Sequence, residues 1–399
     1  MRAGRCWWLA GCLALASAWP ALQAWAATQV PVAVVSLDRD PRYAPRRAER
    51  AYPGHPTTPA IEGVRLAASD SAYELGTQDL ALDVKDFTLT GPDQLNQLLQ
   101  QLKAARVQHV VADLPVPLLR ELARQAPGVL GPALLFNVSQ DADALRGTDC
   151  QPHLLHTYPS RAMTGDALTQ YLASRRWTKV LVLHGPLEDD AVQLDAFRRS
   201  AKRFGIQIVQ ERPFKLSGDP REKDLGNLRL LTGDRQHEVV VVIDSDGEFA
   251  RTVPYATQWP RPVAGAAGLV PLAWHPQWER YGAPQLTRRF LRQTQRAMQG
   301  HDWAAWMAGR AIAAAVLAQP KAGVAAQLQA LRSGAVTLDG FKGKALSFRP
   351  WDGQLRQPVF LTHGDGVVGL APMDGVLHPT ETMDTLGVDR AESACKARP

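Results

Sequence analysis

Short runs of apolar, β-branched residues alternate along the chain with longer segments in which apolar residues recur at helical spacing. In the first half these runs lie at residues 30–36, 109–112 and 133–136, and each is followed by a polar stop. The clearest helical stripe between them consists of Leu95, Leu98, Leu99 and Leu102. This repeated strand-then-helix order predicts an open, mostly parallel α/β sheet.

A second block of the chain repeats the order. It predicts strands at residues 179–183 and 206–209 and a buried strand at 239–243, with a helix before Gly205. Helices are expected at residues 285–299 and 303–318, and the apolar face of the second is typical of core packing rather than of a cofactor site. A late hairpin is expected to pair residues 344–348 with 358–361. Thr58 is expected to cap an earlier helix that has Pro59 at its first position.

The first 26 residues have the pattern of a cleavable secretory signal. Arg2 and Arg5 precede an apolar stretch at residues 6–18, and residues 24–26 form an A-x-A cleavage site, so the mature chain is expected to start near Ala27. Residue 27 is not the cysteine of a lipoprotein, and no later stretch has the run of about 18 apolar residues that a membrane helix needs. The sequence therefore predicts an exported, soluble protein of a bacterial envelope. A length that can bury two cores further suggests two lobes.

Charge excludes some functions. Loss of Arg2 and Arg5 lowers the formal charge by two, from +6 to +4, which is too small and too dispersed to indicate nucleic-acid binding. The basic cluster around Arg46 and Arg47, which also includes Arg39, Arg42 and Arg50, is interpreted as a solvated or ion-paired loop.

Two cysteines remain after processing, and in an oxidising compartment Cys150 and Cys395 are expected to form a disulfide. The alternative is a zinc site built from Cys150, His153 and His156, although this stretch offers no fourth ligand.

The common enzyme motifs are absent together. No G-x-G-x-x-G follows a strand, residues 340–344 lack phosphate-loop spacing, and neither G-x-S-x-G nor H-E-x-x-H occurs. Neither catalysis nor a cofactor is therefore expected.

Three segments carry a resemblance to a known family. They are residues 61–67, residues 155–160 with 166–168, and residues 341–343 running through Phe348 to Gly353. In this order they resemble the type I periplasmic solute-binding proteins of ABC importers, of the branched-chain amino acid class. Residues 50–55, 159–163 and the tail at 384–395 look like the branch associated with PQQ-dependent alcohol oxidation.

This resemblance implies an α/β fold of two Rossmann-like lobes joined by three hinge crossings, with the ligand closed between them. The expected division is lobe 1 at residues 27–157 and 270–338, lobe 2 at 158–269 and 339–370, and a C-terminal tail at 371–399. Ligands of open α/β sheets bind beyond the carboxyl ends of the strands. The candidate ligand residues at such ends or crossings are Asp113, Asn137, Ser139, Tyr158, Ser160, Arg161, Asp190, Asp244 and Trp274.

The sequence departs from the family where an amino acid's carboxylate would bind. Relatives have a Ser/Thr-rich loop after the strand at 109–112, whereas this chain has Asp113 followed by Leu-Pro-Val-Pro. Prolines lack N–H donors and an acid repels a carboxylate. An ordinary amino acid is therefore a poor candidate ligand, and a neutral hydroxylated or carbonyl metabolite fits better.

Two acidic clusters leave a second interpretation open. Glu188, Asp189 and Asp190 follow one predicted strand, and Asp244, Asp246 and Glu248 follow another. Acids at these places cap helices and complement their dipoles, but oxygen-rich loops that converge also suit a hard cation.

The function predicted from the sequence is a monomeric periplasmic solute-binding component of an ABC importer. Its expected partners are a small-molecule ligand, the membrane permease and a quinoprotein dehydrogenase system. The alternatives are a calcium- or lanthanide-type metal delivery protein, a sensor or accessory subunit of a quinoprotein dehydrogenase, and an enzyme with a Glu188/Asp244 acid pair.

Overall fold

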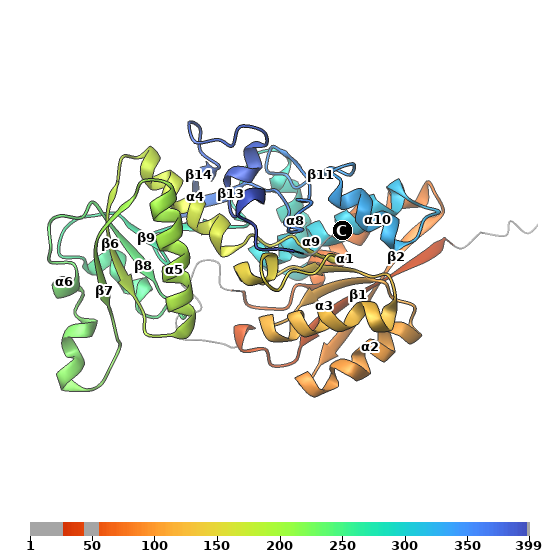
Figure 1. Ribbon diagram of the computed structural model, residues 1–399, viewed down its shortest axis with the longest axis horizontal. Helices are drawn as coiled ribbons and strands as arrows, with labels where there is room; N and C mark the ends of the chain where they lie inside the picture. The colour runs from red at the N-terminus through yellow and green to blue at the C-terminus, as the bar shows by residue number, and fades with distance from the viewer. Residues whose placement is uncertain (1–26, 44–55, 397–399) are drawn as a thin grey trace, which may run out of the picture.

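The computed structural model describes residues 27–43 and 56–396, so the predicted signal and most of the basic cluster lie outside the described residues. Two β-sheets dominate the fold, each flanked by helices, and they lie at opposite ends of an elongated molecule (Figure 1). Within the described residues, no helix combines the length and apolar character needed to cross a bilayer.

The first sheet has five parallel strands in the order β2-β1-β3-β4-β5. Its bounds are β1 Thr28–Leu37, β2 Leu80–Leu89, β3 His109–Asp113, β4 Leu134–Asn137 and β5 Leu154–His156. The central strand β3 is buried along its whole length, which explains its continuous apolar sequence. Sequence patterning missed β2, because Asp83, Lys85 and Asp86 interrupt the apolar run of this half-exposed edge strand.

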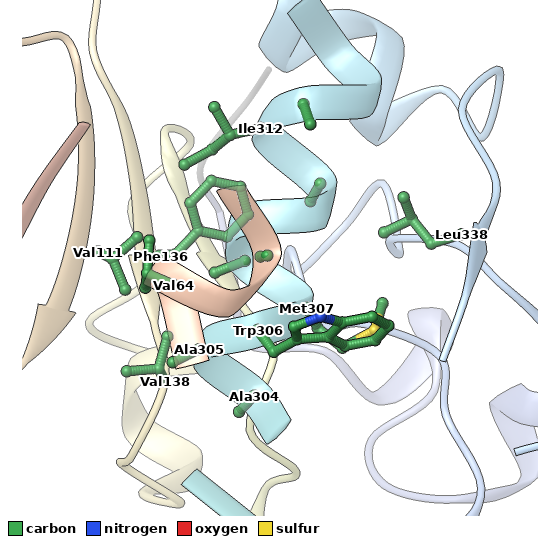
Figure 2. Close-up of a cluster of buried hydrophobic side chains, with 14 of the residues drawn as sticks. Val64, Val111, Phe136, Val138, Ala304, Ala305, Trp306, Met307, Ile312 and Leu338 are labelled. Atoms are coloured by element: carbon green, nitrogen blue, oxygen red, sulfur yellow. The ribbon is translucent and has the colours of Figure 1, made fainter. Parts of the chain in front are cut away.

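Helices cover both faces of the first sheet. On one face lie α2 (Leu95–Ala104) and α3 (Val116–Leu130), and the leucine stripe predicted for α2 is buried. The other face is covered by α1 Ile61–Gly76, α8 Ala283–Thr294, α9 Gly300–Ala318 and α10 Val324–Arg332. Figure 2 shows the core where α9 meets α1 and the sheet, with Val64, Phe136 and Ile312 among its side chains. Trp303, Trp306 and Met307 are fully buried here, which confirms the prediction of core packing.

The second sheet has seven strands in the order β14-β13-β10-β9-β8-β6-β7. Its bounds are β6 Lys179–His184, β7 Gln207–Pro213, β8 Val239–Ile243, β9 Val263–Gly265, β10 Leu269–Leu272, β13 Val359–His363 and β14 Gly366–Ala371. The pairs from β10 to β7 are parallel, and β13 and β14 add an antiparallel edge. Helices α4 (Arg161–Ser174) and α5 (Glu188–Arg203) pack on one face, and α6 (Leu228–Leu231) and α7 (Val253–Ala256) on the other.

Two local predictions were wrong. Residues 359–363 pair with β10 and β14 rather than with 344–348, which instead contribute β12 (Ala345–Leu346) to a small sheet with β11 (Leu338–Asp339). The tight hairpin around residues 352–353 joins Phe348 to Leu355. Helix α1 starts at Ile61, so its cap residue is Ala60 rather than Thr58, and the Ala60 N–H donates to the carboxylate of Asp113 at 2.9 Å.

The chain crosses between the sheets three times: after β5, after β10 and before β13. Side-chain amides tie two of these crossings together, since Gln357 donates to the carbonyl of Thr157 at 2.7 Å and Gln354 donates to that of Tyr158 at 3.2 Å. The buried Lys342 ammonium donates to the Gln357 amide oxygen at 2.9 Å. The lobe boundaries given above remain a prediction, and β10 extends three residues beyond the expected division at 269/270.

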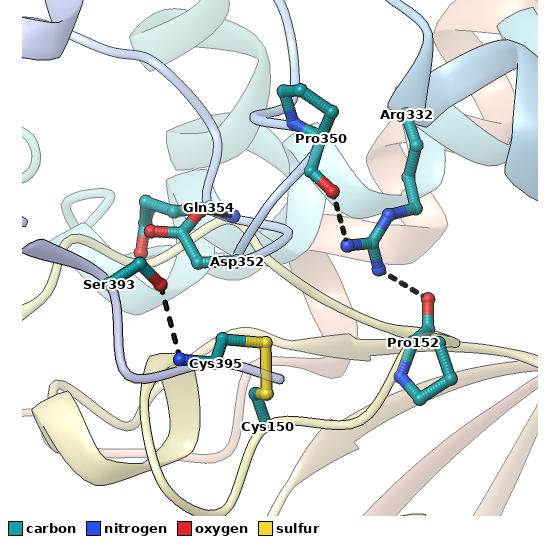
Figure 3. Close-up of a disulfide and its surroundings, with 8 residues drawn as sticks. All are labelled: Cys150, Pro152, Arg332, Pro350, Asp352, Gln354, Ser393 and Cys395. Carbon is teal, nitrogen blue, oxygen red and sulfur yellow. Dashed lines mark hydrogen bonds between the residues drawn. A yellow bond between two sulfur atoms is a disulfide. The ribbon is translucent and has the colours of Figure 1, made fainter. Parts of the chain in front are cut away.

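The C-terminal tail returns from the second sheet to the first. The predicted disulfide between Cys150 and Cys395 is present, with the two Cα atoms 5.6 Å apart, so the alternative zinc site loses its thiolate (Figure 3). Nearby, Arg332 of α10 donates to the carbonyls of Pro152 and Pro350, which links the segment after Cys150 to the hairpin between Phe348 and Leu355. The tail is therefore covalently attached to the segment that leads into β5.

The same tail also contacts helices of the second sheet. The backbone N–H of Gly387 donates to the carboxylate of Asp166 in α4 at 2.8 Å, and Arg203 of α5 bonds both Asp166 and the Gly387 carbonyl. A Cβ at Gly387 would lie 2.8 Å from the Met163 side chain, and the residue has a φ of +85°, so glycine is needed here. We call residues 383–395 the strap, because they connect α4 and α5 to Cys150.

Asp166 gives the strap a pH-dependent contact. Burial raises the pKa of its carboxyl to about 6, above the ordinary value of 3.8. The folded state thus binds this proton more tightly than the unfolded chain, so the contribution to stability is fully present below about pH 4 and is lost as the pH rises through about 6. We expect Asp166→Asn to gain stability relative to the wild type between pH 4 and pH 7, by up to about 3 kcal/mol. Urea unfolding of both proteins across this range measures the difference, and a pH-independent difference would contradict the expectation.

Candidate ligand-binding site

A cavity of about 500 Å³ lies between the two sheets, beyond the carboxyl ends of several parallel strands. Residues after β1, β4 and β5 line it from the first sheet, together with the start of α9. Residues of α4, α5, β8, β9 and β10 line it from the second. In an open α/β sheet, loops at this edge meet at the points where helices leave in opposite directions, which is why ligand sites form there. We call this cavity the cleft.

Arg42 is the first charged group of the cleft, and its positive charge is paired with two buried carboxylates that do not line the cleft. Its guanidinium donates to Asp40 at 2.6 Å, to Asp113 at 3.2 Å and to the Ser139 hydroxyl at 2.7 Å. Asp113 is fully buried and also accepts from the Tyr43 hydroxyl at 2.6 Å and from Ala60 at the start of α1. Burial alone would raise the pKa of Asp113, but Arg42, His301 and Tyr43 outweigh it and hold this pKa below its ordinary value.

Asp113 is therefore not the isolated acid that the sequence suggested. It satisfies the positive end of α1 and the Arg42 cation, and among the described residues it does not line the cleft. The group that faces the cleft is Arg42, which the sequence placed correctly in an ion-paired loop.

Arg161 is the second charged group of the cleft, at the first residue of α4. It donates to Asp141, in the loop after β4, at 3.0 Å and to Asp189, in the first turn of α5, at 2.5 Å. Burial would lower the pKa of Arg161, but these two carboxylates raise it further above its ordinary value. Since Asp141 follows a strand of the first sheet and Asp189 belongs to a helix of the second, this ion triad spans the cleft.

The wall on the second sheet is largely apolar. Its apolar residues come from two helices and two strands: Leu168, Ala196, Phe197, Val241, Val242, Ile243, Val270 and Leu272. The wall opposite carries the polar groups Ser139, Gln140, Tyr158 and His301. Burial of Tyr158 raises the pKa of its phenol, so the hydroxyl stays neutral and can donate a hydrogen bond.

Of the nine candidate ligand residues, the structure places Ser139, Tyr158 and Arg161 in the cleft lining. The other candidates are held by the protein itself. Asn137 shapes the loop after β4 by bonding the backbone of Gln140, and Ser160 caps α4 by accepting from the Met163 N–H. Trp274 is 2% exposed and stacks on Trp303 within the first core.

The acidic clusters also cap local structure. Asp190 is buried and accepts from the backbone N–H groups of Leu187 and Ser245, while Asp244 accepts from that of Ala250 and has a pKa raised to about 6 by burial. Glu188 and Glu248 are exposed, and Asp246 accepts from the Glu248 N–H. In the part of the chain that the structure describes, no three His, Cys, Asp or Glu side chains are grouped so as to hold a metal ion.

Sequence analysis missed several residues of the cleft. Ser245 comes directly after the predicted strand stop at Asp244, Asp141 lies four residues after the stop at Asn137, and Gln193 lies one helical turn after Asp189, so both strand ends and helix starts gave a usable signal. His301 and Ala266 gave none, because their positions depend on how α9 and β9 pack in three dimensions.

Comparisons with known proteins found matches by structure but not by sequence. No protein-family model matches the chain, and no curated protein matches its sequence. Solved structures do match. One is the leucine-, isoleucine-, valine-, threonine- and alanine-binding protein from Brucella ovis in its closed conformation, with a TM-score of 0.69 and 15% identity over 94% of this chain and 100% of that one.

Two further neighbours agree. A periplasmic binding protein from Burkholderia mallei has a TM-score of 0.66 and 11% identity, covering 92% of this chain and 98% of that one. A solute-binding protein of an ABC transporter from R. palustris, in complex with benzoate, has a TM-score of 0.62 and 12% identity, covering 92% and 100%. The chain has the type I periplasmic binding protein fold. At these identities the likeness concerns the fold alone.

The type I periplasmic binding protein fold accounts for the main features of the site. Its two sheets, three crossings and interposed cleft are those implied by the sequence resemblance, and that expectation of fold class is confirmed. A further neighbour, from Burkholderia xenovorans, is a periplasmic ligand-binding protein of a branched-chain amino acid ABC transporter.

Proposed function

We propose that this protein is the periplasmic solute-binding component of an ABC importer and that it captures a small molecule in the cleft. The observation that carries the proposal is the 500 Å³ cavity, to which both sheets contribute side chains beyond the ends of parallel strands. Neighbours of this fold with leucine or benzoate bound support it, since they are solute-binding proteins of ABC transporters.

The proposed mechanism is a hinge motion that the ligand stabilises. A molecule that contacts both walls of the cleft binds the closed arrangement better than an open one, and this difference in affinity shifts the population toward closure. The amide bonds between crossings and the ion triad of Asp141, Arg161 and Asp189 are the contacts that such a motion would bend or break. The function is binding and delivery to the membrane permease rather than catalysis.

We further propose that the solute belongs to a quinoprotein alcohol oxidation system, because the tail at 384–395 resembles proteins of that branch. Deletion of the gene should then impair growth on alcohols and spare growth on sugars or organic acids. Equal growth on all carbon sources would leave the importer role standing and remove this link.

Native mass spectrometry of the protein purified from its own periplasm tests the importer proposal. High-affinity capture predicts a small-molecule adduct that survives gentle purification and disappears on unfolding.

A further inference from the structure

We infer that the cleft takes an uncharged, amphiphilic molecule with a hydroxyl or carbonyl oxygen, and that it discriminates against carboxylates and amines. This inference rests on the proposed solute-binding function and adds the chemical class of the solute. Two observations carry it: every charge in the cleft lining is already paired, and one buried amide donor is not.

The formal charges on the lining residues Arg42, Arg161, Asp141 and Asp189 sum to zero, and Asp40 and Asp113 add two negative charges behind Arg42. Arg161 is shared between Asp141 and Asp189, and Arg42 donates to Asp40 and Asp113 in a buried layer behind the cleft. His301 donates from Nε2 to the carbonyl of Thr58 at 2.8 Å, so this ring nitrogen is also used. A ligand carboxylate at either arginine would compete with two protein carboxylates for the guanidinium, and at Arg42 these carboxylates are buried, so weakening their contact with the cation is costly.

A ligand ammonium group would face competition for the carboxylates of the lining. The acids of the lining, Asp141 and Asp189, both bind Arg161, and Asp189 also accepts from Gln193 at 2.8 Å. A ligand cation would have to compete with Arg161 for one of these carboxylates. An uncharged molecule leaves all of these pairs intact.

Gln140 offers the cleft a hydrogen-bond donor for a ligand oxygen. It is 8% exposed and lines the cleft, and its Nε2 donor has no hydrogen-bond partner among the described residues. Its position is fixed, because both its backbone N–H and its carbonyl bond the Asn137 side chain. A buried donor without a partner is costly, and an oxygen acceptor on a ligand would satisfy it.

The apolar wall defines the rest of the molecule. Phe197, Val241 and Leu272 belong to the lining and have apolar side chains, so the part of the ligand that lies against the second sheet should be hydrocarbon. A molecule with an oxygen at the Gln140 end and a hydrocarbon body toward α5 and β8 matches both walls.

Three probes with one skeleton test the inference: phenylpropanol, phenylpropanoate and phenylpropylamine. By ligand-observed NMR titration of the full-length mature protein, we expect phenylpropanol to bind at least about tenfold more tightly than either charged probe. Gln140→Met should weaken phenylpropanol binding about tenfold, because it removes the donor and keeps the side-chain length.

The pairing of Arg161 with two carboxylates predicts that a variant lacking one of them binds phenylpropanoate more tightly. Asp189→Asn removes one of the two carboxylates that hold Arg161 and should improve phenylpropanoate binding at least about tenfold. Asp195→Asn is the matched control, because Asp195 lies on the same helix but pairs with Arg198, away from the cleft. It should leave the affinities of all three probes unchanged.

The results separate the inference from the function on which it rests. Tighter binding of phenylpropanoate or phenylpropylamine than of phenylpropanol overturns the ligand class, and if Ala266→Trp in the cleft abolishes that binding, the solute-binding function stands. Failure of phenylpropanol to bind also overturns the inference. In that case the solute-binding function would still be supported if native mass spectrometry detected a small-molecule adduct on the wild type and none on Ala266→Trp.

Discussion

Replacing Asp384 with asparagine is expected to destabilise the folded protein by about 3–5 kcal/mol, the cost of breaking a buried ion pair from one side. Asp384 is 3% exposed and accepts from Arg349 at 2.8 Å and from Arg356 at 2.8 and 2.9 Å. Arg349 is itself 1% exposed and also donates to the carbonyls of Met383 and Leu386 in the strap. Without the carboxylate, two guanidinium groups share a buried site with backbone carbonyls alone as close partners on the strap.

Asp374→Asn is the control, because Asp374 lies on an exposed part of the same tail. Urea unfolding should place this control within about 0.5 kcal/mol of the wild type. Equal stabilities of the two variants would show that the strap is not anchored by Asp384.

Loss of the disulfide is expected to have the second largest effect. The bridge joins residues 245 positions apart, and cross-linking so long a loop restricts the unfolded chain, so Cys150→Ser/Cys395→Ser should lower the free energy of unfolding by about 2–5 kcal/mol. The measurement is urea unfolding of the double variant beside the oxidised wild type.

A reduced wild-type sample provides the matched control, because it removes the bond without changing the sequence otherwise. The reduced wild type should unfold at the same urea concentration as the double variant. Two free thiols in the oxidised, unfolded wild type would contradict the disulfide itself, and a loss below about 1 kcal/mol would contradict its stabilising role.

The strands of both sheets were predictable from the sequence because buried parallel strands are continuous apolar runs, whereas the arrangement of two lobes with three crossings was implied by the family resemblance. Strands β3, β4, β6 and β8 and the stripe of α2 were found in this way. Edge strand β2 was not predicted, because a strand paired on one side tolerates charges such as Lys85. The start of α1 was misplaced because its first N–H group is satisfied by Asp113, 53 residues away, and local capping rules cannot anticipate that partner.

The candidate site was less predictable, and the reason is electrostatic. Asp113, Asp190 and Asp244 were singled out as polar residues after strands, but the structure shows each of them accepting backbone or side-chain donors of the protein. Whether a strand-end carboxylate faces a ligand or caps a helix depends on partners distant in sequence, such as Arg42 for Asp113. The roles of the nine candidates toward a ligand stay predictions.

The tail shows how a motif recognised by resemblance acquires a physical role. Asp384, Gly387 and Cys395 belong to the segment that resembles the quinoprotein-associated branch. In the structure they anchor the strap to Arg349, to Asp166 and to Cys150. Since these anchors lie on both sides of the crossings, the strap is placed to limit the range of any hinge motion.

The central claim is that the cleft holds the solute, and filling the cleft tests it most directly. Ala266 lines the cavity, whereas Ala325 is exposed on α10, so Ala266→Trp fills the cleft and Ala325→Trp is its control. Native mass spectrometry of protein purified from its own periplasm should detect a small-molecule adduct on the wild type and on Ala325→Trp, and none on folded Ala266→Trp. An adduct that persists on Ala266→Trp, or its absence from all three proteins, would contradict the account.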